Sequence, residues 1–254
     1  MGRAFVTGDI HGSLDIGKLT EAQWPLGQTL SRDDYLLICG DFGLVWGVPP
    51  TPTAARWLDW LDSQPWTTLF VDGNHENHDL LDVMDVSAWH GGNVHVLPGH
   101  PHVIHLMRGN VYEMGEHGRW FTFGGATSSD RAWRVEGKSW WAREKPNEAE
   151  YDAGQAALER VNWQVDYVFT HDVPGERVRR AMAHLPGVSP AWDPPRNQLE
   201  QYLQWVDEHL DPARFKRWYC GHYHADKLLG DERHVLLYQQ VVELGELPRE
   251  PHDA

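Results

Sequence analysis

Five short segments of this 254-residue chain place metal-binding residue types directly after an apolar stretch. They are Gly8-Asp9-Ile10-His11, Gly40-Asp41, Gly73-Asn74-His75-Glu76, Thr170-His171-Asp172 and Gly221-His222-Tyr223-His224. Most of them begin with glycine, which lets the backbone turn sharply and approach a ligand closely. Imidazole, carboxylate and amide groups without thiolate suit Mn, Fe or Zn. The chemistry that these residue types suggest is therefore metal-assisted.

The stretches that precede these segments are typical of short buried strands. We expect strands over residues 4–7, 35–39, 67–71, 94–97, 103–107, 110–114, 120–123, 166–170, 217–220 and 235–244. We expect helices over residues 53–63, 148–161 and 198–210, the last with Asn197 and Glu200 as a capping box. Residues 108–110 are interpreted as a hairpin turn. Alternating strands and helices predict a layered α/β fold, in which ligands gather beyond the carboxyl ends of the strands.

The composition restricts the classes of protein that this chain can belong to. It has 22 Lys and Arg against 37 Asp and Glu, a formal charge of −15, with 16 His, 14 Trp and only 2 Cys. Two cysteines cannot build a disulfide framework or a four-cysteine zinc site. The acidity argues against extended nucleic-acid binding, which requires clustered Lys and Arg. The thiols Cys39 and Cys220 are expected to be reduced core residues.

The chain is expected to form one soluble, cytoplasmic domain without a membrane partner. No apolar leader precedes the first strand, and no apolar run approaches the ~18 residues that span a bilayer. No Gly- or Pro-rich linker divides the sequence, so we expect a single domain over residues 1–247 and a polar tail over 248–254. The oligomeric state is left open.

Individual members of these segments also have simpler interpretations. A single Gly-Asp after a strand is usually turn chemistry, and a single histidine such as His171 is usually a core residue. The combination favours a site because every one of the five segments falls at an expected strand end. His95, His100, His102 and His105 form a local cluster of another kind, which follows a strand–turn–strand spacing and is not expected to bind metal.

Taken in order, these segments resemble the motifs of the calcineurin-like metallophosphoesterases. The matching motifs are Asp9-x-His11, Gly40-Asp41, Gly73-Asn74-His75-Glu76, His171 and Gly221-His222-x-His224. The resemblance covers most of the chain, and the overall pattern looks more like the small bacterial or phage members of the family. It implies a four-layer αββα sandwich, in which two mixed β-sheets are flanked by helices. It also implies a dinuclear metal site at the carboxyl ends of the strands.

The resemblance implies a role for each matching residue. Asp9, His11 and His224 would bind one divalent metal, Asn74, His171 and His222 the other, and Asp41 would bridge the two. His75 is not in the ligand set, and the resemblance implies that it faces the substrate as a general acid or charge stabiliser. Two divalent metals, which could be Mn, Fe or Zn, would activate a bridging hydroxide for attack on phosphorus.

The sequence departs from the phosphoprotein phosphatases of this family after Asp41. That branch continues there with Val-Asp-Arg-Gly, whereas this chain continues with Phe42-Gly43-Leu44. The acidic partner of His75 and an arginine for phosphate are therefore missing from the expected place. Glu76 is adjacent to His75 but can point away from it. A phosphoprotein phosphatase is consequently disfavoured.

A local reversal of charge could supply the missing cation. Residues 131–145 carry five basic side chains against two acidic ones, together with three tryptophans. We expect residues 127–147 to form a cap or insertion, in which Arg131, Arg134 and Arg143 are the candidate substrate-binding residues. The alternative is a solvated loop whose tryptophans pack into the core. A second basic cluster, Arg177, Arg179 and Arg180, is expected on an exposed helical face.

The leading hypothesis is a metal-dependent hydrolase of phosphoester bonds. Its substrate would be a small phosphomonoester or phosphodiester, for example a nucleotide. The alternatives are a nuclease of the same family and a non-catalytic interaction scaffold that retains the metal site. Acidity disfavours the nuclease, and the complete ligand set together with His75 disfavours the scaffold.

Overall fold

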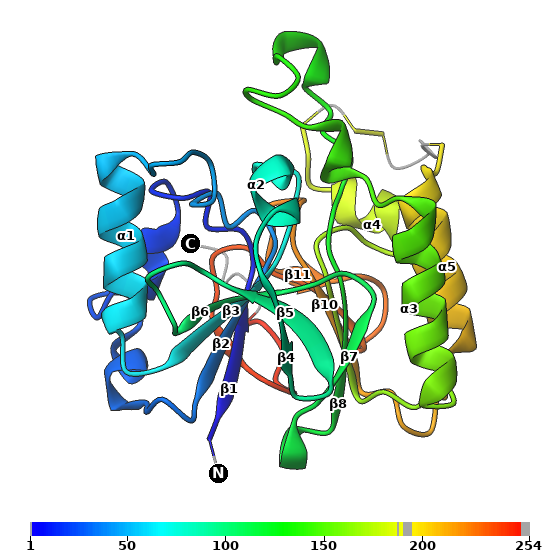
Figure 1. The fold of residues 1–254 in the computed structure, drawn as a ribbon. Coiled ribbons are helices and arrows are strands. Elements are labelled where there is room, and N and C mark those ends of the chain that lie inside the picture. The colour runs from blue at the N-terminus through cyan, green and yellow to red at the C-terminus, as the bar shows by residue number, and fades with distance from the viewer. Residues whose placement is uncertain (1, 187, 190–194, 250–254) are drawn as a thin grey trace.

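Two mixed β-sheets pack face to face and helices cover their outer faces (Figure 1). This computed structural model describes residues 2–186, 188–189 and 195–249. From one edge to the other, the strands of the first sheet are β13 (Val242–Glu243), β1 (Ala4–Thr7), β2 (Tyr35–Cys39), β3 (Thr67–Val71), β6 (Val103–Leu106), β5 (Gly92–Val96) and β4 (Val86–Trp89). Strands β1, β2, β3 and β6 run parallel, so their carboxyl ends share one edge.

The second sheet repeats this arrangement with a different set of strands. It consists of β11 (Lys227–Leu228), β12 (His234–Leu236), β10 (Arg217–Cys220), β9 (Tyr167–Thr170), β8 (Arg119–Phe123) and β7 (Asn110–Glu113). Strands β12, β10, β9 and β8 are parallel, and the outer strands β11 and β7 are antiparallel to their neighbours. The predicted class, two mixed sheets in an α/β fold, is confirmed.

Three buried apolar layers account for this stacking. One lies between the sheets, where Leu37 and Leu69 pack with Phe169 and Tyr219. Another joins the first sheet to α1 (Pro52–Ser63) through residues such as Leu61. The third joins the second sheet to α3 (Glu148–Arg160) and α5 (Gln198–His209). Because both faces of the central strands are buried, strands such as β1, β2 and β3 lack a solvent-exposed polar face, whereas the edge strand β4 is largely exposed.

The three predicted helices are present, each within one residue of its expected bounds. The capping box of Asn197 and Glu200 is confirmed, with both reciprocal hydrogen bonds made. Among the helices and strands of the described residues, α2 (His78–Asp82), β4 and β11 were not predicted, and α4 (Val178–Met182) was expected only as an exposed helical face with basic residues. Each has five residues or fewer, too short for an apolar period to identify it.

Two sequence predictions of connectivity are wrong. Residues 108–110 do not form a hairpin, because β6 and β7 belong to different sheets and this turn carries the chain between them. The predicted strand over 235–244 is two strands, β12 and β13, which also lie in different sheets. The chain leaves the second sheet where the backbone N–H groups of Tyr238, Gln239 and Gln240 donate to the carboxylate of Asp226.

Residues 127–147 leave the end of β8 and rise as an arm above the carboxyl edge of the sheets (Figure 1). Only short 3₁₀ turns interrupt the arm, at Arg131–Trp133 and Ala142–Glu144. Of the predicted tail at 248–254, residues 250–254 lie outside the described part of the chain. Among the described residues, every helix is too short or too polar to span a bilayer.

Candidate metal centre

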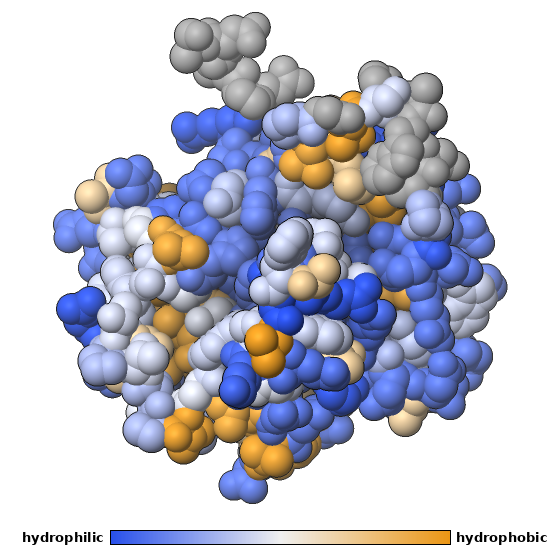
Figure 2. Space-filling view, turned by 90° about the horizontal axis from the view of Figure 1, so that it is seen from above, coloured by the Kyte–Doolittle hydropathy of each residue, from blue (hydrophilic) through white to orange (hydrophobic). Residues whose placement is uncertain are grey.

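The five predicted segments follow β1, β2, β3, β9 and β10, at the carboxyl ends of these parallel strands. Seen from above, the face on which they open is largely hydrophilic, with apolar side chains in separate patches (Figure 2). The prediction that these loops converge is confirmed by the contacts among their side chains. The polar residues that follow the parallel strands of both sheets therefore lie close to one another.

Glycine is required next to the candidate ligands because there is no room there for a side chain. A Cβ on Gly73 would lie 2.2 Å from Oδ1 of Asp41, and a Cβ on Gly221 would lie 2.2 Å from Oδ1 of Asp9. Gly40 has φ of +88°, and a Cβ there would lie 2.2 Å from Nδ1 of His171. Any side chain at these positions would displace a candidate ligand, which explains why glycine accompanies the motifs.

Four candidate ligands have a left-handed backbone, which is uncommon for residues other than glycine. The φ angles are 43° for His11, 46° for Asp41, 72° for His222 and 50° for His224. Such conformations persist only where the surrounding structure enforces them, and they cluster at functional sites. Here they turn the side chains back over the ends of the strands.

Asp41 lies between two groups of ligands and faces each with a different oxygen. Its Oδ2 lies 3.2 Å from Nε2 of His11, and its Oδ1 lies 3.2 Å from Nε2 of His171. The backbone N–H of His75 donates to Oδ1 at 2.8 Å and fixes the carboxylate. This is the geometry expected of a bridging carboxylate.

The first group contains Asp9, His11, Asp41 and His224. One ligand atom from each of them lies within 4.8 Å of all the others. Nε2 of His224 is 3.2 Å from Oδ2 of Asp9. The backbone N–H of His222 donates to both oxygens of the fully buried Asp9 carboxylate. This donor set of carboxylates and imidazoles fits a divalent cation.

The second group contains Asn74, His171 and His222. Nδ1 of His171 lies 2.8 Å from the carbonyl oxygen of Cys39 and donates to it, so the lone pair of Nε2 points into the site. That nitrogen is 3.3 Å from Oδ1 of Asn74 and 3.2 Å from Oδ1 of Asp41. The ring of His222 packs edge-on against His171, with 4.9 Å between centroids. Imidazole nitrogen, amide oxygen and carboxylate oxygen thus face one another, and this donor set fits a divalent metal.

The pKa values show how strongly this site favours positive charge. Burial alone would lower the pKa of His171, but Asp41 and Asp9 outweigh burial and raise it to about 10. For His11 burial also acts to lower the pKa, and Asp41 and Asp9 raise it to about 9. Burial would raise the pKa of Asp41, yet the imidazoles of His171 and His11 hold it well below its usual range.

Two side chains that the sequence did not single out support the ligands. Oδ2 of Asp15 lies 2.7 Å from Nδ1 of His11, which leaves Nε2 of that ring directed at Asp41. Tyr238 donates its hydroxyl to the other oxygen of Asp15. Outer partners of this kind set the tautomer and the orientation of metal-binding imidazoles. The only sequence signal for Asp15 was an acidic residue four positions after His11.

Glu76 points away from His75. The buried carboxylate accepts hydrogen bonds from the backbone N–H groups of Phe42, Gly43 and Gly73. It thereby ties together the loops that follow β2 and β3. Its burial and the nearby carboxylate of Asp41 raise the pKa of Glu76 to about 8. Glu76 is a structural support of the site and does not orient His75.

Arg134 of the arm contacts His75. Its Nη2 lies 3.0 Å from Nε2 and 3.4 Å from Nδ1 of the imidazole. Nε of Arg134 donates to Asp130, and the 2.8 Å ion pair holds the guanidinium in place. The His75 ring is also 5.3 Å from that of His11, and its Nε2 is 3.9 Å from Oδ2 of Asp41. A cation from the arm therefore stands beside the predicted catalytic histidine.

The other two predicted arginines are placed differently. Arg131 lies 5.7 Å from the ring centre of Trp140, and its Nε donates to the carbonyl of Ser128. All three nitrogens of the Arg143 guanidinium are bound by the carboxylates of Asp82 and Glu150. The structure thus brings Arg134, but neither Arg131 nor Arg143, into contact with His75. Their substrate-binding roles remain predictions.

The tryptophans of the arm divide between the two interpretations of this segment. Trp141 is buried, donates to Asp79 and packs edge-on against Trp46 at 5.1 Å. This side chain anchors the base of the arm, as the alternative interpretation expected. Trp133 is 90% exposed and stands next in sequence to Arg134. An uncovered indole therefore lies one residue from the guanidinium that meets His75.

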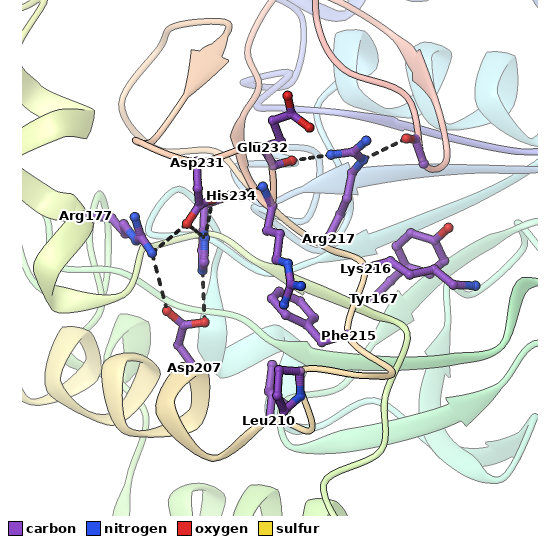
Figure 3. Close-up of a pocket in the computed structure, with 13 residues that line it drawn as sticks. Tyr167, Arg177, Asp207, Leu210, Phe215, Lys216, Arg217, Asp231, Glu232 and His234 are labelled. Carbon is purple, nitrogen blue, oxygen red and sulfur yellow. Dashed lines mark hydrogen bonds and ion pairs between the residues drawn. The ribbon is translucent and has the colours of Figure 1, made fainter.

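A cavity of about 920 Å³ lies away from these residues, at the amino ends of β9, β10 and β12 (Figure 3). In it His234 lies between Asp231 and Asp207, and Arg177 pairs with Asp231 at 2.8 Å. None of the candidate metal ligands lines it. The size of this cavity does not make it the reaction site, because the donor groups gather at the opposite, carboxyl edge. The neighbouring Arg179 and Arg180 are exposed on α4, as expected, but Arg177 is half-buried in the turn before this helix because it pairs with Asp231.

Comparison with known proteins agrees with this geometry. The sequence model of the calcineurin-like phosphoesterase family matches residues 2–229. The chain therefore belongs to the calcineurin-like phosphoesterases, and this membership supports a metal-dependent hydrolase of phosphoester bonds. Among solved structures, it is similar to the phosphopantetheinyl hydrolase PptH of Mycobacterium tuberculosis. That similarity has 14% identity and a TM-score of 0.46, and covers 93% of this chain and 88% of the other. No curated protein matches the sequence.

Proposed function

We propose that this chain is a dinuclear metallophosphoesterase that hydrolyses a small phosphomonoester or phosphodiester. The observation that carries the proposal is the position of Asp41, whose two oxygens each lie 3.2 Å from an imidazole of a different ligand group. A single carboxylate shared in this way favours two cations rather than one. Mn, Fe and Zn all suit such a donor set.

The ligand assignment follows the two groups. Asp9, His11 and His224 would hold one metal, and Asn74, His171 and His222 the other, with Asp41 common to both. When bound, the two ions would supply Lewis-acid activation of the phosphoryl group and a water of lowered pKa. Asn74 offers a neutral oxygen, which limits the negative charge that faces the anionic substrate.

His75 and Arg134 would act on the substrate from the side of the arm. The guanidinium can donate two parallel hydrogen bonds to phosphate oxygens. His75, which lies between Arg134 and Asp41, would deliver a proton to the leaving oxygen. Together they would replace the acidic partner and the arginine that this sequence lacks after Asp41.

The arm also bears on the class of substrate. Trp133 presents an exposed flat face near Arg134, which suits an aromatic or other flat group attached to the phosphate. A nucleotide meets both requirements. The overall charge of −15 opposes long polyanions, so the proposed substrate is a small molecule.

Metal reconstitution tests the proposal. Protein stripped of metal and reloaded with Mn²⁺, Fe²⁺ or Zn²⁺ would be assayed on p-nitrophenyl phosphate, bis-p-nitrophenyl phosphate and mono-, di- and cyclic nucleotides. Asp41→Asn should lose at least about 100-fold in affinity for both ions, more than an outer-sphere change costs, and nearly all activity. Asp33→Asn, which changes an exposed aspartate two residues before the start of β2, is the matched control.

Two outcomes would contradict the proposal. One is reconstituted protein that hydrolyses none of these esters. The other is Asp41→Asn protein that binds two equivalents of metal as tightly as the wild type. The ratio of activity on the two nitrophenyl esters distinguishes a phosphatase from a phosphodiesterase.

A further inference from the structure

A buried chain of hydrogen bonds connects the base of the arm to Asn74. The side-chain N–H of Asn74 donates to Oγ of Ser128 at 3.2 Å, and the Ser128 hydroxyl donates to Oε2 of Glu144 at 2.6 Å. The backbone N–H of Ser128 donates to the other oxygen of Glu144 at 2.9 Å. Asn74, Ser128 and Glu144 are 4%, 3% and 0% exposed. All three are thus shielded from competing water.

The direction of these bonds decides which end of the Asn74 amide faces the site. The two ends of an asparagine amide are nearly the same size, so its orientation depends on its hydrogen-bond partners. Ser128 has one hydroxyl hydrogen, and the 2.6 Å bond to Glu144 has the length of a charge-assisted O–H···O⁻ bond. With that hydrogen committed, Oγ can only accept from its other neighbour.

The consequence reaches the ligand atom. Because Oγ of Ser128 only accepts, Asn74 must present its NH₂ group to it. Oδ1 of Asn74 is then left on the side of His171, where it lies 3.3 Å from Nε2. A reversed amide would aim N–H hydrogens at a cation and would leave a buried oxygen against a serine lone pair.

We propose that Ser128 and Glu144 are positioning residues that orient Asn74 as a metal ligand. The inference rests on the proposed function, in which Asn74 binds one of two metals. The inference gives the arm a second role. Arg134 of the arm contacts His75, and Ser128 and Glu144 at its base orient Asn74, the residue before His75. The arm would consequently be part of the metal centre, in addition to the role of cap predicted from the sequence.

Calorimetric titration of metal-stripped protein with Mn²⁺ tests this inference without relying on turnover. Ser128→Ala and Glu144→Gln should each weaken one of the two binding events by about 10- to 100-fold, the usual loss when an outer partner of a ligand is removed. The other event should be unchanged. Glu144→Gln nearly preserves side-chain volume and serves where the alanine variant does not fold, as judged by thermal unfolding.

The matched control is Ser129→Ala, which removes the hydroxyl of the adjacent, exposed serine and should titrate as the wild type does. Asn74→Ala is the reference for complete loss of the ligand. Wild-type affinity in both Ser128→Ala and Glu144→Gln, with loss in Asn74→Ala, would overturn the positioning role alone. Wild-type affinity in Asn74→Ala would overturn the proposed ligand set instead.

Discussion

Removing the guanidinium of Arg134 should slow hydrolysis without weakening the metal centre. Nη2 of Arg134 lies 3.0 Å from Nε2 of His75, and Asp130 holds the guanidinium there. A hydrogen bond that involves a charged group contributes about 1.5–3 kcal/mol. Since about 1.4 kcal/mol corresponds to a tenfold change in rate, Arg134→Ala should lower kcat/KM by about 10- to 150-fold.

The assay compares p-nitrophenyl phosphate with phenyl phosphate, whose leaving group is poorer, in protein loaded with Mn²⁺. If Arg134 acts on phosphate, both substrates lose a similar factor. If it acts through His75, phenyl phosphate loses more, because a poor leaving group depends more on protonation. Arg134→Lys retains the charge but not the paired donors, so it should recover only part of the rate.

The neighbouring arginines of the arm are internal controls for this prediction. Arg131 stacks on Trp140 and Arg143 is bound by two carboxylates, so alanine at either position should change kcat/KM by less than about threefold if the contacts of Arg134 set the rate. Metal content should equal that of the wild type in all three variants. Arg134→Ala with kcat/KM within twofold of the wild type would refute the reasoning.

Three further predictions concern catalysis and stability. His75→Ala should retain both metals but lower kcat by about 100-fold or more, as measured by metal analysis and kinetics. If His75→Ala lost as much metal as Asp41→Asn does, His75 would be a ligand and not the general acid. Arg108→Met removes the guanidinium that pairs with the buried carboxylate of Asp72, leaves it with imidazole neighbours such as His105, and should cost about 3–5 kcal/mol in urea unfolding. Arg119→Ala, which breaks a more exposed pair, should cost less than about 1 kcal/mol, and equal costs would contradict the reasoning. Burial, with the nearby imidazole of the facing strand, lowers the pKa of His95 to about 4. The unfolded chain therefore binds a proton first as pH falls below about 6.5, and stability is lost on acidification. Between pH 8 and pH 5, the wild type should lose about 2 kcal/mol more of its unfolding free energy than His95→Asn loses. A difference in unfolding free energy between the two proteins that stays constant with pH would contradict this prediction.

Local pattern was sufficient for the strands that carry the ligands. Residues 4–7, 35–39, 67–71 and 217–220 are apolar runs with polar residues directly after them, and the structure has strands with these bounds. A buried parallel strand needs apolar residues on both faces, and the turn after it needs glycine and polar groups. Both requirements are met within about ten residues of sequence, so they could be recognised without the fold.

The connections between strands required information that no local pattern contains. The segment at 108–110 has the composition of a hairpin turn, yet Arg108 is buried against Asp72 while the chain passes to the other sheet. The stretch 235–244 is apolar enough for one strand. In the middle of this stretch, however, the backbone N–H groups of Tyr238 and Gln240 donate to the carboxylate of Asp226. In both places a charged partner distant in sequence decided the path of the chain.

The sequence by itself determined the composition of this site: seven candidate ligands and a histidine, each at the end of an expected strand, because strand ends and glycine turns are encoded locally. Only the tertiary structure decided which charges surround them. Arg131, Arg134 and Arg143 are equivalent as a sequence pattern, but Arg131 and Arg143 are engaged by neighbours elsewhere, whereas the ion pair with Asp130 holds Arg134 against His75. Likewise, only packing could bring Ser128 and Glu144 beneath Asn74. Side chains far apart in sequence compete for the same partners, and that competition is resolved in three dimensions.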